Sequence, residues 1–318
     1  MTFFIKFCNF PHVTPPEKLR IIQSLSGLTQ EKIARELGVS FVTLNSWMRG
    51  RSTPRAKAQA RIDGLYRSTT GQKVIPEGAL QAKLRVLQKK SREHRNILKT
   101  ILTRRDLYDQ FVLSLTYNTN RIEGSTLTEP ETAAILFQNI SLPGKTLVEQ
   151  MEVKNHQAAL EFLFQSTQKR EEIDQDFILK LHRILLNGIQ SDAGAYRNHP
   201  VRIVGSRVVT ANHVKVPSLM KDLETAIHHG GKDTISHASQ IHSRFEKIHP
   251  FSDGNGRIGR LLVHRMLLAK NLPPAVIRQE EKRFYMTALS KAQLEEDDSL
   301  LTDFLCEAVL EAYRILEM

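Results

Sequence analysis

Residues 249–260 bring together the groups that transfer from a nucleotide requires. His249 is a titratable imidazole, Asp253 is a carboxylate, and Arg257 and Arg260 follow a glycine-rich turn. Histidine is the side chain whose unperturbed pKa suits removal of a proton near pH 7. The Asp253 carboxylate is a hard oxygen ligand of the kind that Mg²⁺ prefers. Together these groups predict transfer from a nucleotide onto a hydroxyl.

The turn Gly254-Asn255-Gly256 leads directly into an apolar helical pattern. Its glycines let backbone N–H groups close around anionic oxygens, and a helix that begins near Gly256 directs its positive end to the same place. Arg257 and Arg260 are three residues apart, so they share a helix face and both reach one phosphate chain. The segment predicts a phosphate site at a helix N-terminus.

The same stretch resembles the signature of the Fic family, which reads His-x-Phe-x-(Asp/Glu)-Gly-Asn-Gly-Arg-x-x-Arg. Every fixed position of that pattern is met between His249 and Arg260. The alternative is a glycine-rich turn before an ordinary helix, which would need neither the histidine nor both arginines. The resemblance implies a protein adenylyltransferase, which moves AMP from ATP to a Ser, Thr or Tyr hydroxyl of a target protein.

The resemblance also assigns roles. His249 would take the proton of the target hydroxyl, Asp253 would hold Mg²⁺ between the α- and β-phosphates, and the Asn255 side chain would add to the backbone contacts of the turn. Both arginines would steady the β- and γ-phosphates, which leave as pyrophosphate. Phosphate contacts are thus expected at Gly254, Asn255, Gly256, Arg257 and Arg260, and adenine contacts at Tyr285 and Gln293.

A second segment, residues 119–124, resembles the inhibitory motif of the same family, (Ser/Thr)-x-x-x-Glu-(Gly/Asn). It supplies Thr119, Glu123 and Gly124 at the end of a helical pattern, with the glycine where a helix C-terminus favours it. In the family this glutamate pairs with the second arginine of the signature, which is Arg260 here. An arginine held by a carboxylate is not free to hold a γ-phosphate, so the resemblance implies autoinhibition. Some such members also remove AMP, which leaves that activity open.

Between these segments, residues 194–209 change from a helical to an extended pattern. Apolar positions on both sides of a turn at Gly205-Ser206 predict a β-hairpin. It resembles the flap of the family, which registers an extended target segment by strand pairing, and the alternative is a surface hairpin with no partner. The residues expected at the flap are Val204, Gly205 and Ser206.

The segment 28–47 reads as helix, glycine turn, helix, with Gly38 in the turn and Ser40 as the cap of the second helix. It resembles the helix-turn-helix of phage-repressor-type regulators, including the Trp-x-x-Gly-x-x-x-Pro that ends at Pro54. The apolar positions expected between its helices are Ile33, Ala34, Leu37, Val39, Val42 and Trp47.

Positive charge is concentrated in this region. Residues 11–67 hold ten Lys or Arg and four Asp or Glu, a net +6 of the total +11. The second helix would enter the major groove of DNA, and a paired module predicts a homodimer. Small helical pairs also serve as protein-docking modules, which is the alternative. Base edges would meet Ser40, Phe41, Thr43 and Asn45, and phosphates would meet Arg49 and Arg51.

A chain of 318 residues is long enough for two domains. We expect a helix-turn-helix DNA-binding domain at 1–70, a basic helical linker at 71–106 and a Fic domain at 107–318, with its inhibitory helix at about 107–124. The fold class is mainly α, a Fic-type helical core with one β-hairpin flap after the small helix-turn-helix domain. Helical spacing marks 151–165, 176–186, 219–229, 235–248, 257–269, 281–293 and 300–315.

The composition excludes several classes. Two cysteines, Cys8 and Cys306, do not form a disulfide framework, and no zinc-type His or Cys/His motif is present. No apolar run approaches the roughly 20 residues that span a bilayer, and the apolar start lacks a cleavage site. We expect a soluble chain without a membrane partner, cytoplasmic in a bacterium or, alternatively, an effector delivered into a host cell by a specialised secretion system.

Three hypotheses follow. The first is an adenylyltransferase that uses ATP and Mg²⁺, modifies an unidentified target protein and itself, and is restrained by Glu123. The second keeps the fold but transfers phosphate or another nucleotide; relatives that phosphorylate carry Lys where Gly256 stands, which favours AMP. The third is a DNA-binding regulator whose core only senses nucleotide. The presence of His249 and Asp253 argues against it, because a sensor needs no base.

Overall fold

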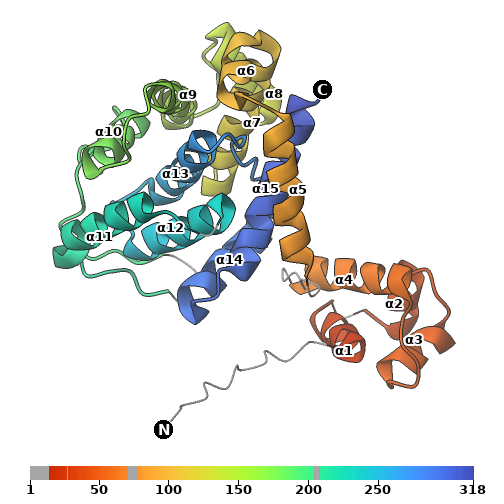
Figure 1. The fold of residues 1–318 in the computed structure, drawn as a ribbon. Coiled ribbons are helices and arrows are strands. Elements are labelled where there is room, and N and C mark those ends of the chain that lie inside the picture. The colour runs from red at the N-terminus through yellow and green to blue at the C-terminus, as the bar shows by residue number, and fades with distance from the viewer. Residues whose placement is uncertain (1–13, 27, 71–77, 204–205, 207, 232) are drawn as a thin grey trace. The chain divides into compact units, whose positions relative to one another are not determined.

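The computed structural model describes residues 14–26, 28–70, 78–203, 206, 208–231 and 233–318. It divides into two compact units, Met1–Pro76 and Glu77–Met318, each of which is described by itself (Figure 1). Within the described residues both units are built from helices and no strand is formed. The mainly α class expected from the sequence is confirmed. None of the helices in these residues is long and apolar enough to cross a membrane.

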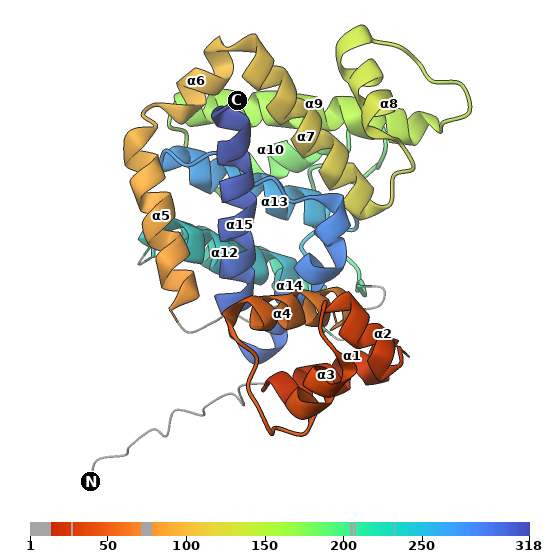
Figure 2. The ribbon, with the colours of Figure 1, turned by 90° about the vertical axis from the view of Figure 1, so that its right-hand side faces the viewer.

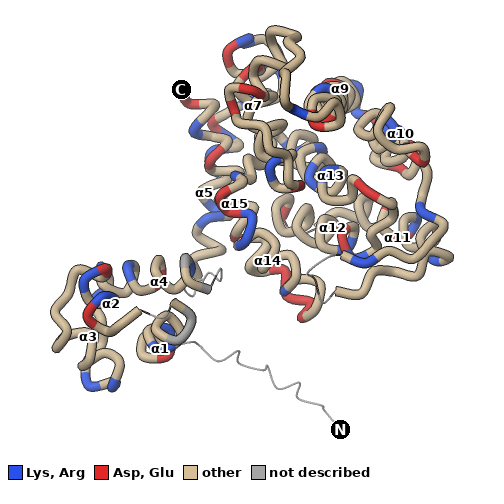
Figure 3. The backbone as a smooth tube through the Cα atoms, turned by 180° about the vertical axis from the view of Figure 1, so that it is seen from behind, with Lys and Arg blue, Asp and Glu red and all other residues tan. Residues whose placement is uncertain are grey.

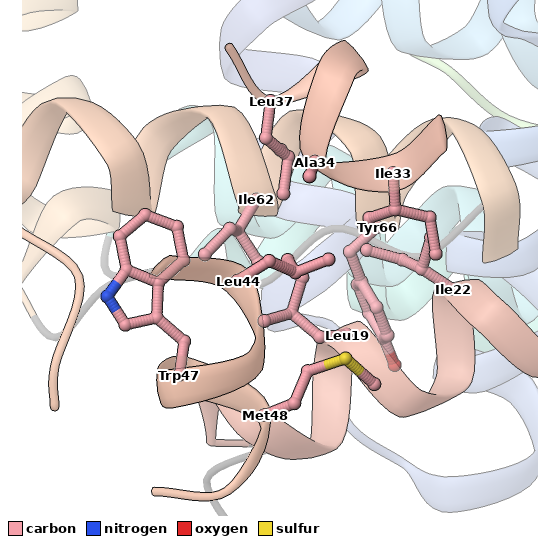
Figure 4. Packing of buried hydrophobic residues seen from close by; sticks show 10 residues of the cluster. All are labelled: Leu19, Ile22, Ile33, Ala34, Leu37, Leu44, Trp47, Met48, Ile62 and Tyr66. Carbon is pink, nitrogen blue, oxygen red and sulfur yellow. The ribbon is translucent and has the colours of Figure 1, made fainter. Parts of the chain in front are cut away.

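The described residues of the first unit form four helices, α1 (Pro15–Ser26), α2 (Gln30–Glu36), α3 (Phe41–Met48) and α4 (Ala56–Thr70). Helices α2 and α3 form the helix-turn-helix, and α1 and α4 complete its core. Figure 4 shows how their apolar side chains interlock. The buried cluster consists of Leu19, Ile22, Ile33, Ala34, Leu37, Leu44, Trp47, Met48, Ile62 and Tyr66.

The turn between α2 and α3 follows the expected chemistry. Gly38 has a φ of 64°, which favours glycine, and the Ser40 hydroxyl accepts the Thr43 N–H at 3.1 Å as the cap of α3. Val42 was expected in the core, but it is 75% exposed. Because α3 begins at Phe41, its buried face contains Leu44 and the residues three and four positions later, which leaves Val42 on the outer face.

The second unit is a helical assembly around α13 (Asn255–Ala269), in which every residue from Arg257 to Leu268 is buried. Helices α7, α9, α10 and α12 pack against α13. All seven C-terminal helices that the spacing predicts are present, and their ends move by only a few residues. The other elements are α5 (Ala79–Glu93), α6 (Ile97–Thr103), α7 (Arg105–Glu123), α8 (Glu129–Ala133), η1 (Ala134–Gln138), α9 (Leu147–Gln168), α10 (Gln175–Leu185), η2 (His213–Lys215), α11 (Val216–His229), α12 (Thr234–Ile248), η3 (Gln279–Glu281), α14 (Lys282–Glu295) and α15 (Ser299–Leu316).

Residues 79–103 differ from the linker expected at 71–106. Helix α5 lies beside α15 in both Figure 1 and Figure 2, and Lys83 Nζ is 2.5 Å from Asp303 Oδ1. The Asn271 side chain donates to the carbonyl oxygens of Ser91 and His94 at 3.0 and 2.8 Å. The basic helix is therefore part of the second unit, because Leu84 and Leu87 are buried and Lys83 contacts Asp303 of α15.

Candidate active site

A pocket of about 790 Å³ opens where α12 ends and α13 begins, with walls from α7 and α14. Residues far apart in sequence line it, since Glu123 ends α7, the turn 249–254 follows α12, and Tyr285 and Gln293 lie on α14. The signature residues in the lining are His249, Asp253, Gly254, Asn255, Gly256 and Arg260. The pocket brings together the signature and the segment expected to inhibit it.

His249 is the C-cap residue of α12, and its backbone is in the left-handed conformation with a φ of 52°. Its Nδ1 lies 3.3 Å from the carbonyl oxygen of Glu246, and its own carbonyl accepts from Arg197 Nε at 2.7 Å. Burial lowers the pKa of the ring, and the hydrogen bond to Glu246 opposes this without reversing it. The imidazole is therefore held in place and neutral near pH 7.

The signature turn is held by its own side chains. Asn255 accepts from the Phe251 N–H and donates to the Phe251 carbonyl, both at 2.9 Å. The side chain of Asn255 therefore braces the turn, which differs from the phosphate contact expected for it. Gly254 has a φ of 77° and opens α13, so the N-terminus of that helix faces the pocket.

Asp253 stands at the mouth of the pocket. Its side chain is 52% exposed, Oδ1 accepts the Gly254 N–H at 2.6 Å, and Oδ2 lies 3.5 Å from Arg257 Nη2. Among the described residues, no group of three or more His, Cys, Asp or Glu is placed to hold a metal ion. A single accessible carboxylate fits a Mg²⁺ site in which phosphate oxygens and water molecules supply the remaining ligands.

Both arginines of the signature are paired with carboxylates. Arg257 Nη1 donates to Glu152 Oε1 of α9 at 2.6 Å, and Arg260 Nη2 donates to Glu123 Oε1 at 2.5 Å. No sequence pattern indicated Glu152, because it lies more than a hundred positions from its partner in an ordinary helical pattern. A carboxylate on each guanidinium is a strong, directed contact.

The pair of Glu123 and Arg260 is fixed on several sides. Arg260 has 3% of its side chain exposed, its Nε donates to Thr119 Oγ1 at 2.7 Å, and Gly124 ends α7 with a φ of 108°. Burial alone would raise the pKa of Glu123, but the charge and hydrogen bond of Arg260 outweigh it and hold that pKa below its usual value. Glu123 is therefore an anion bound to Arg260, as the resemblance implied.

A buried polar layer lies under the pocket. The Tyr285 hydroxyl is 2.6 Å from His242 Nε2, and Gln293 Nε2 donates to the Ser243 carbonyl at 3.3 Å. Burial raises the pKa of Glu246 to about 8, although the charge of Arg260 opposes this. Tyr285 and Gln293 thus line the pocket but have polar ends bonded to α12, and adenine contact by them stays a prediction. Sequence patterns missed Glu246 and His242, since their spacing indicated only a buried helix face.

The flap segment lies partly outside the described residues, which omit Val204, Gly205 and Arg207. Of the described part, Ile203 and Ser206 line the pocket, and the Ser206 N–H donates to the Ile203 carbonyl at 3.2 Å. Thr210 Oγ1 donates to the Val201 carbonyl at 2.7 Å. The described residues on both sides of the tip form a loop closed by a side chain, rather than the paired strands of the expected hairpin.

In the first unit, the residues expected to meet base edges lie on α3 and at its N-cap. Phe41 and Val42 are exposed, whereas the hydroxyls of Ser40 and Thr43 lie 2.8 Å apart and bond to one another. Figure 3 marks Lys and Arg in the turn after α3 and along α4. Asn45 is half-buried, and the cations after the helix, Arg49, Arg51, Arg55 and Lys57, are exposed.

Comparison with known families agrees with both parts of the geometry. Residues 172–267 match the model of the Fic/DOC family, which includes α10 to most of α13 and the whole signature. Residues 18–58 match a helix-turn-helix model, so the helix-turn-helix expected ahead of the Fic domain is confirmed.

Curated relatives carry the same domain. The chain is 34% identical over 188 residues to a protein adenylyltransferase Fic of Nematostella vectensis, which covers 55% of this chain and 42% of that protein. It is 32% identical over 208 residues to protein adenylyltransferase fic-1 of Caenorhabditis elegans. That alignment covers 64% of this chain and 39% of the other protein. The chain thus spans about two fifths of the length of these relatives.

Solved structures share the fold. A Fic domain containing signaling protein from Bacteroides thetaiotaomicron has a TM-score of 0.64 at 26% identity, covering 74% of this chain and 98% of that one. Fic-1 from Caenorhabditis elegans has a TM-score of 0.67 at 24% identity, and the match covers 97% of this chain and 88% of that one. The second likeness is one of fold alone.

Proposed function

We propose that this chain transfers AMP from ATP to a Ser, Thr or Tyr hydroxyl of a target protein, and to itself. The observation that carries the proposal is the shared pocket: a neutral imidazole, an accessible carboxylate and a helix N-terminus line one cavity. Curated relatives named protein adenylyltransferase support the reaction class. The pocket volume of about 790 Å³ suits a nucleotide.

In this mechanism, His249 Nε2 takes the proton of the target hydroxyl while the oxygen of that hydroxyl attacks the α-phosphorus of ATP. The bond from the α-phosphorus to the bridging oxygen breaks, and pyrophosphate leaves. The N-terminus of α13 stabilises the negative charge on the phosphate oxygens, and Arg257 and Arg260 bind the departing phosphates. Positioning and preorganised charge supply most of the rate enhancement.

Asp253 is the residue that would hold magnesium. Bound there with the nucleotide, the ion would neutralise charge on the α- and β-phosphates. The carboxylate is already oriented, because its Oδ1 accepts the Gly254 N–H at 2.6 Å.

We further propose that Glu123 restrains the enzyme. Arg260 is buried and has both its Nε and its Nη2 occupied by α7. A γ-phosphate needs the same guanidinium, so ATP meets an occupied anchor and binds in an unproductive pose. Lys282, which also lines the pocket, adds positive charge near Glu123 and helps to keep its carboxylate ionised by lowering its pKa.

The reaction is tested with ATP labelled at either the α- or the γ-phosphate. AMP transfer requires that protein acquires the α-label and never the γ-label, and His249→Ala should abolish it. Incorporation of the γ-label would replace the proposal by phosphate transfer. Absence of both labels in the Glu123→Gly protein would leave a core that only binds nucleotide.

Restraint by Glu123 is tested by self-labelling of matched variants. Glu123→Gly should raise the rate by about tenfold or more, since it frees the buried guanidinium of Arg260 from a carboxylate whose side chain is 34% exposed. Glu123→Gln keeps the size but loses the charge and should also activate, whereas the exposed Glu129→Gln should not. Equal labelling of wild type and Glu123→Gly would remove Glu123 from this role.

Removal of AMP is a second candidate activity of the same site. The Glu123 carboxylate is ionised and lines the pocket, so it is placed to orient a water molecule. Wild type with Mg²⁺ should then strip AMP from a premodified target, and Glu123→Gly should not. Complete retention of AMP by the wild-type protein would limit Glu123 to inhibition.

For the first unit we propose DNA binding as a homodimer, on a two-fold site with half-sites about one helical turn apart. The exposed face of α3 and the exposed Arg49 and Arg51 after it support this. Arg49→Gln with Arg51→Gln should weaken binding and reduce its salt dependence, and deletion of residues 1–67 should abolish binding while self-labelling persists. Undiminished DNA binding by the truncated protein would refute the assignment.

A further inference from the structure

A second pocket of the Glu77–Met318 unit shares no lining residue with the candidate active site. It has a volume of about 720 Å³ and lies where the turn between α5 and α6 meets the C-terminal ends of α9 and α13. Helix α13 therefore begins at one pocket and ends at the other. The charged residues in the lining are all cations: Arg95, Lys99, Arg170 and Arg265.

These cations lack acidic partners. Among the described residues, no ion pair joins Arg95, Lys99 or Arg170 to a carboxylate, and no Asp or Glu lines the pocket. Lys169, next in sequence to Arg170, pairs only loosely with Glu171, with 3.9 Å between the charged atoms. Four like charges around one cavity repel one another, so a bound anion would relieve this repulsion.

Arg265 is a buried cation of this pocket. Its residue is 4% exposed, its Nη2 donates to the Glu171 carbonyl, and its buried Nε has no hydrogen-bond partner. Burial lowers its pKa, and the more distant Glu171 charge does not restore it. A guanidinium in this state has an unmet requirement for an anionic acceptor.

Helix stability does not account for the cluster. Cations favour the C-terminal ends of helices, which fits Arg170 and Arg265. Arg95, however, precedes α6, and Lys99 lies in its first turn, where the helix dipole disfavours positive charge. Leu98 and Leu268 supply an apolar part of the lining, as small-molecule sites usually have.

We propose that this pocket is a second binding site, for a small ligand that carries two or more phosphate groups. Arginine binds phosphate oxygens in a forked, bidentate way, and three arginines and a lysine around one cavity suit a ligand with several such groups. The proposal is independent of the reaction at His249, because the two pockets are separate.

The test is calorimetric titration of the full chain with inorganic tripolyphosphate at about 0.15 M salt, where binding to scattered surface charge is screened. Wild type should bind at two sites. One of them is the phosphate site proposed at the N-terminus of α13, called the cradle below. Arg95→Gln with Lys99→Gln should weaken one site by about tenfold or more, since each lost charge-assisted contact weakens binding. Both residues are exposed, so the fold should persist, and thermal melting checks it.

The matched control is Arg85→Gln with Lys89→Gln, which removes the same charge from the exposed face of α5. It should keep both sites, and Arg257→Gln should weaken only the cradle. A single site that Arg257→Gln removes would overturn the proposal. Equal weakening by the pocket pair and the control pair would overturn it as well, since binding would then follow net charge.

Discussion

The Nδ1 of His249 lies 3.3 Å from the carbonyl oxygen of Glu246, one helical turn earlier in the chain. A carbonyl only accepts hydrogen bonds, so Nδ1 carries the ring proton and Nε2 keeps a free lone pair. The end of α12 therefore selects the tautomer of the base before any substrate is bound.

The first prediction concerns the pH dependence of self-labelling by Glu123→Gly. His249 acts as a base only when it is neutral, and burial lowers its pKa from the usual 6.5. The rate should stay level from pH 7 upward and fall about tenfold per unit below a midpoint under pH 6.5. Rates measured from pH 5 to 8 check this; a midpoint above 7 would contradict it.

The second prediction concerns stability. Glu246 has a pKa of about 8 in the folded state, against 4.5 ordinarily, so the folded state holds its proton more tightly. Its contribution is complete below pH 4.5 and is lost as the pH rises through about 8. Glu246→Gln should flatten this decline, which approaches about 1.4 kcal/mol per pH unit where Glu246 alone titrates.

Urea unfolding from pH 6.5 to 8 provides the measurement. Three buried histidines, His156, His242 and His264, have pKa values lowered by burial from 6.5. They still bind protons in the unfolded state near pH 6.5 and so contribute a rise of stability with pH, equally in both variants. The difference in slope between wild type and Glu246→Gln therefore reports Glu246. The same slope in wild type and Glu246→Gln would show that Glu246 is ionised throughout.

The third prediction concerns Thr119. Its hydroxyl accepts from Arg260 Nε at 2.7 Å and so orients the guanidinium towards Glu123. Thr119→Val keeps the shape but leaves that buried donor unpaired, which costs about 1–3 kcal/mol. Self-labelling should lie between wild type and Glu123→Gly. Thr225→Val, on the exposed surface of α11, is the control; wild-type labelling by Thr119→Val would limit Thr119 to a structural role.

The fourth prediction concerns the turn of the first unit. A Cβ at Gly38 would lie 2.6 Å from Arg61 Nη1, at a φ of 64°. Gly38→Ala should therefore destabilise this unit by more than about 1 kcal/mol. Gly64→Ala is the matched control: it lies within α4 with no atom within 4 Å of its Cβ, and should stabilise by about 0.5–1 kcal/mol. Thermal melting separates the two, and equal shifts would contradict the strain at Gly38.

The sequence predicted most of the helices and the signature, because both are local. Period-3.6 spacing marks a buried face, and the phosphate turn requires particular residues in a fixed order. The pair of Glu123 and Arg260 was accessible only through resemblance, since 137 positions separate the two residues. No local pattern predicts Glu152 on Arg257, or the attachment of α5 to α15, because each depends on which helix faces meet. The bracing of the turn by Asn255 was not predicted, because this residue type suits both a phosphate and its own turn.

Gly256 leads to a final consequence. A Cβ at this position would collide with Glu123 Oε1 and lie 3.1 Å from Arg260 Nη1. Any larger residue there, including the lysine of phosphorylating relatives, would have to displace the carboxylate from where it now lies. A larger residue at position 256 would therefore act on two proposals at once, because it would occupy the space that the carboxylate of the proposed restraint now fills.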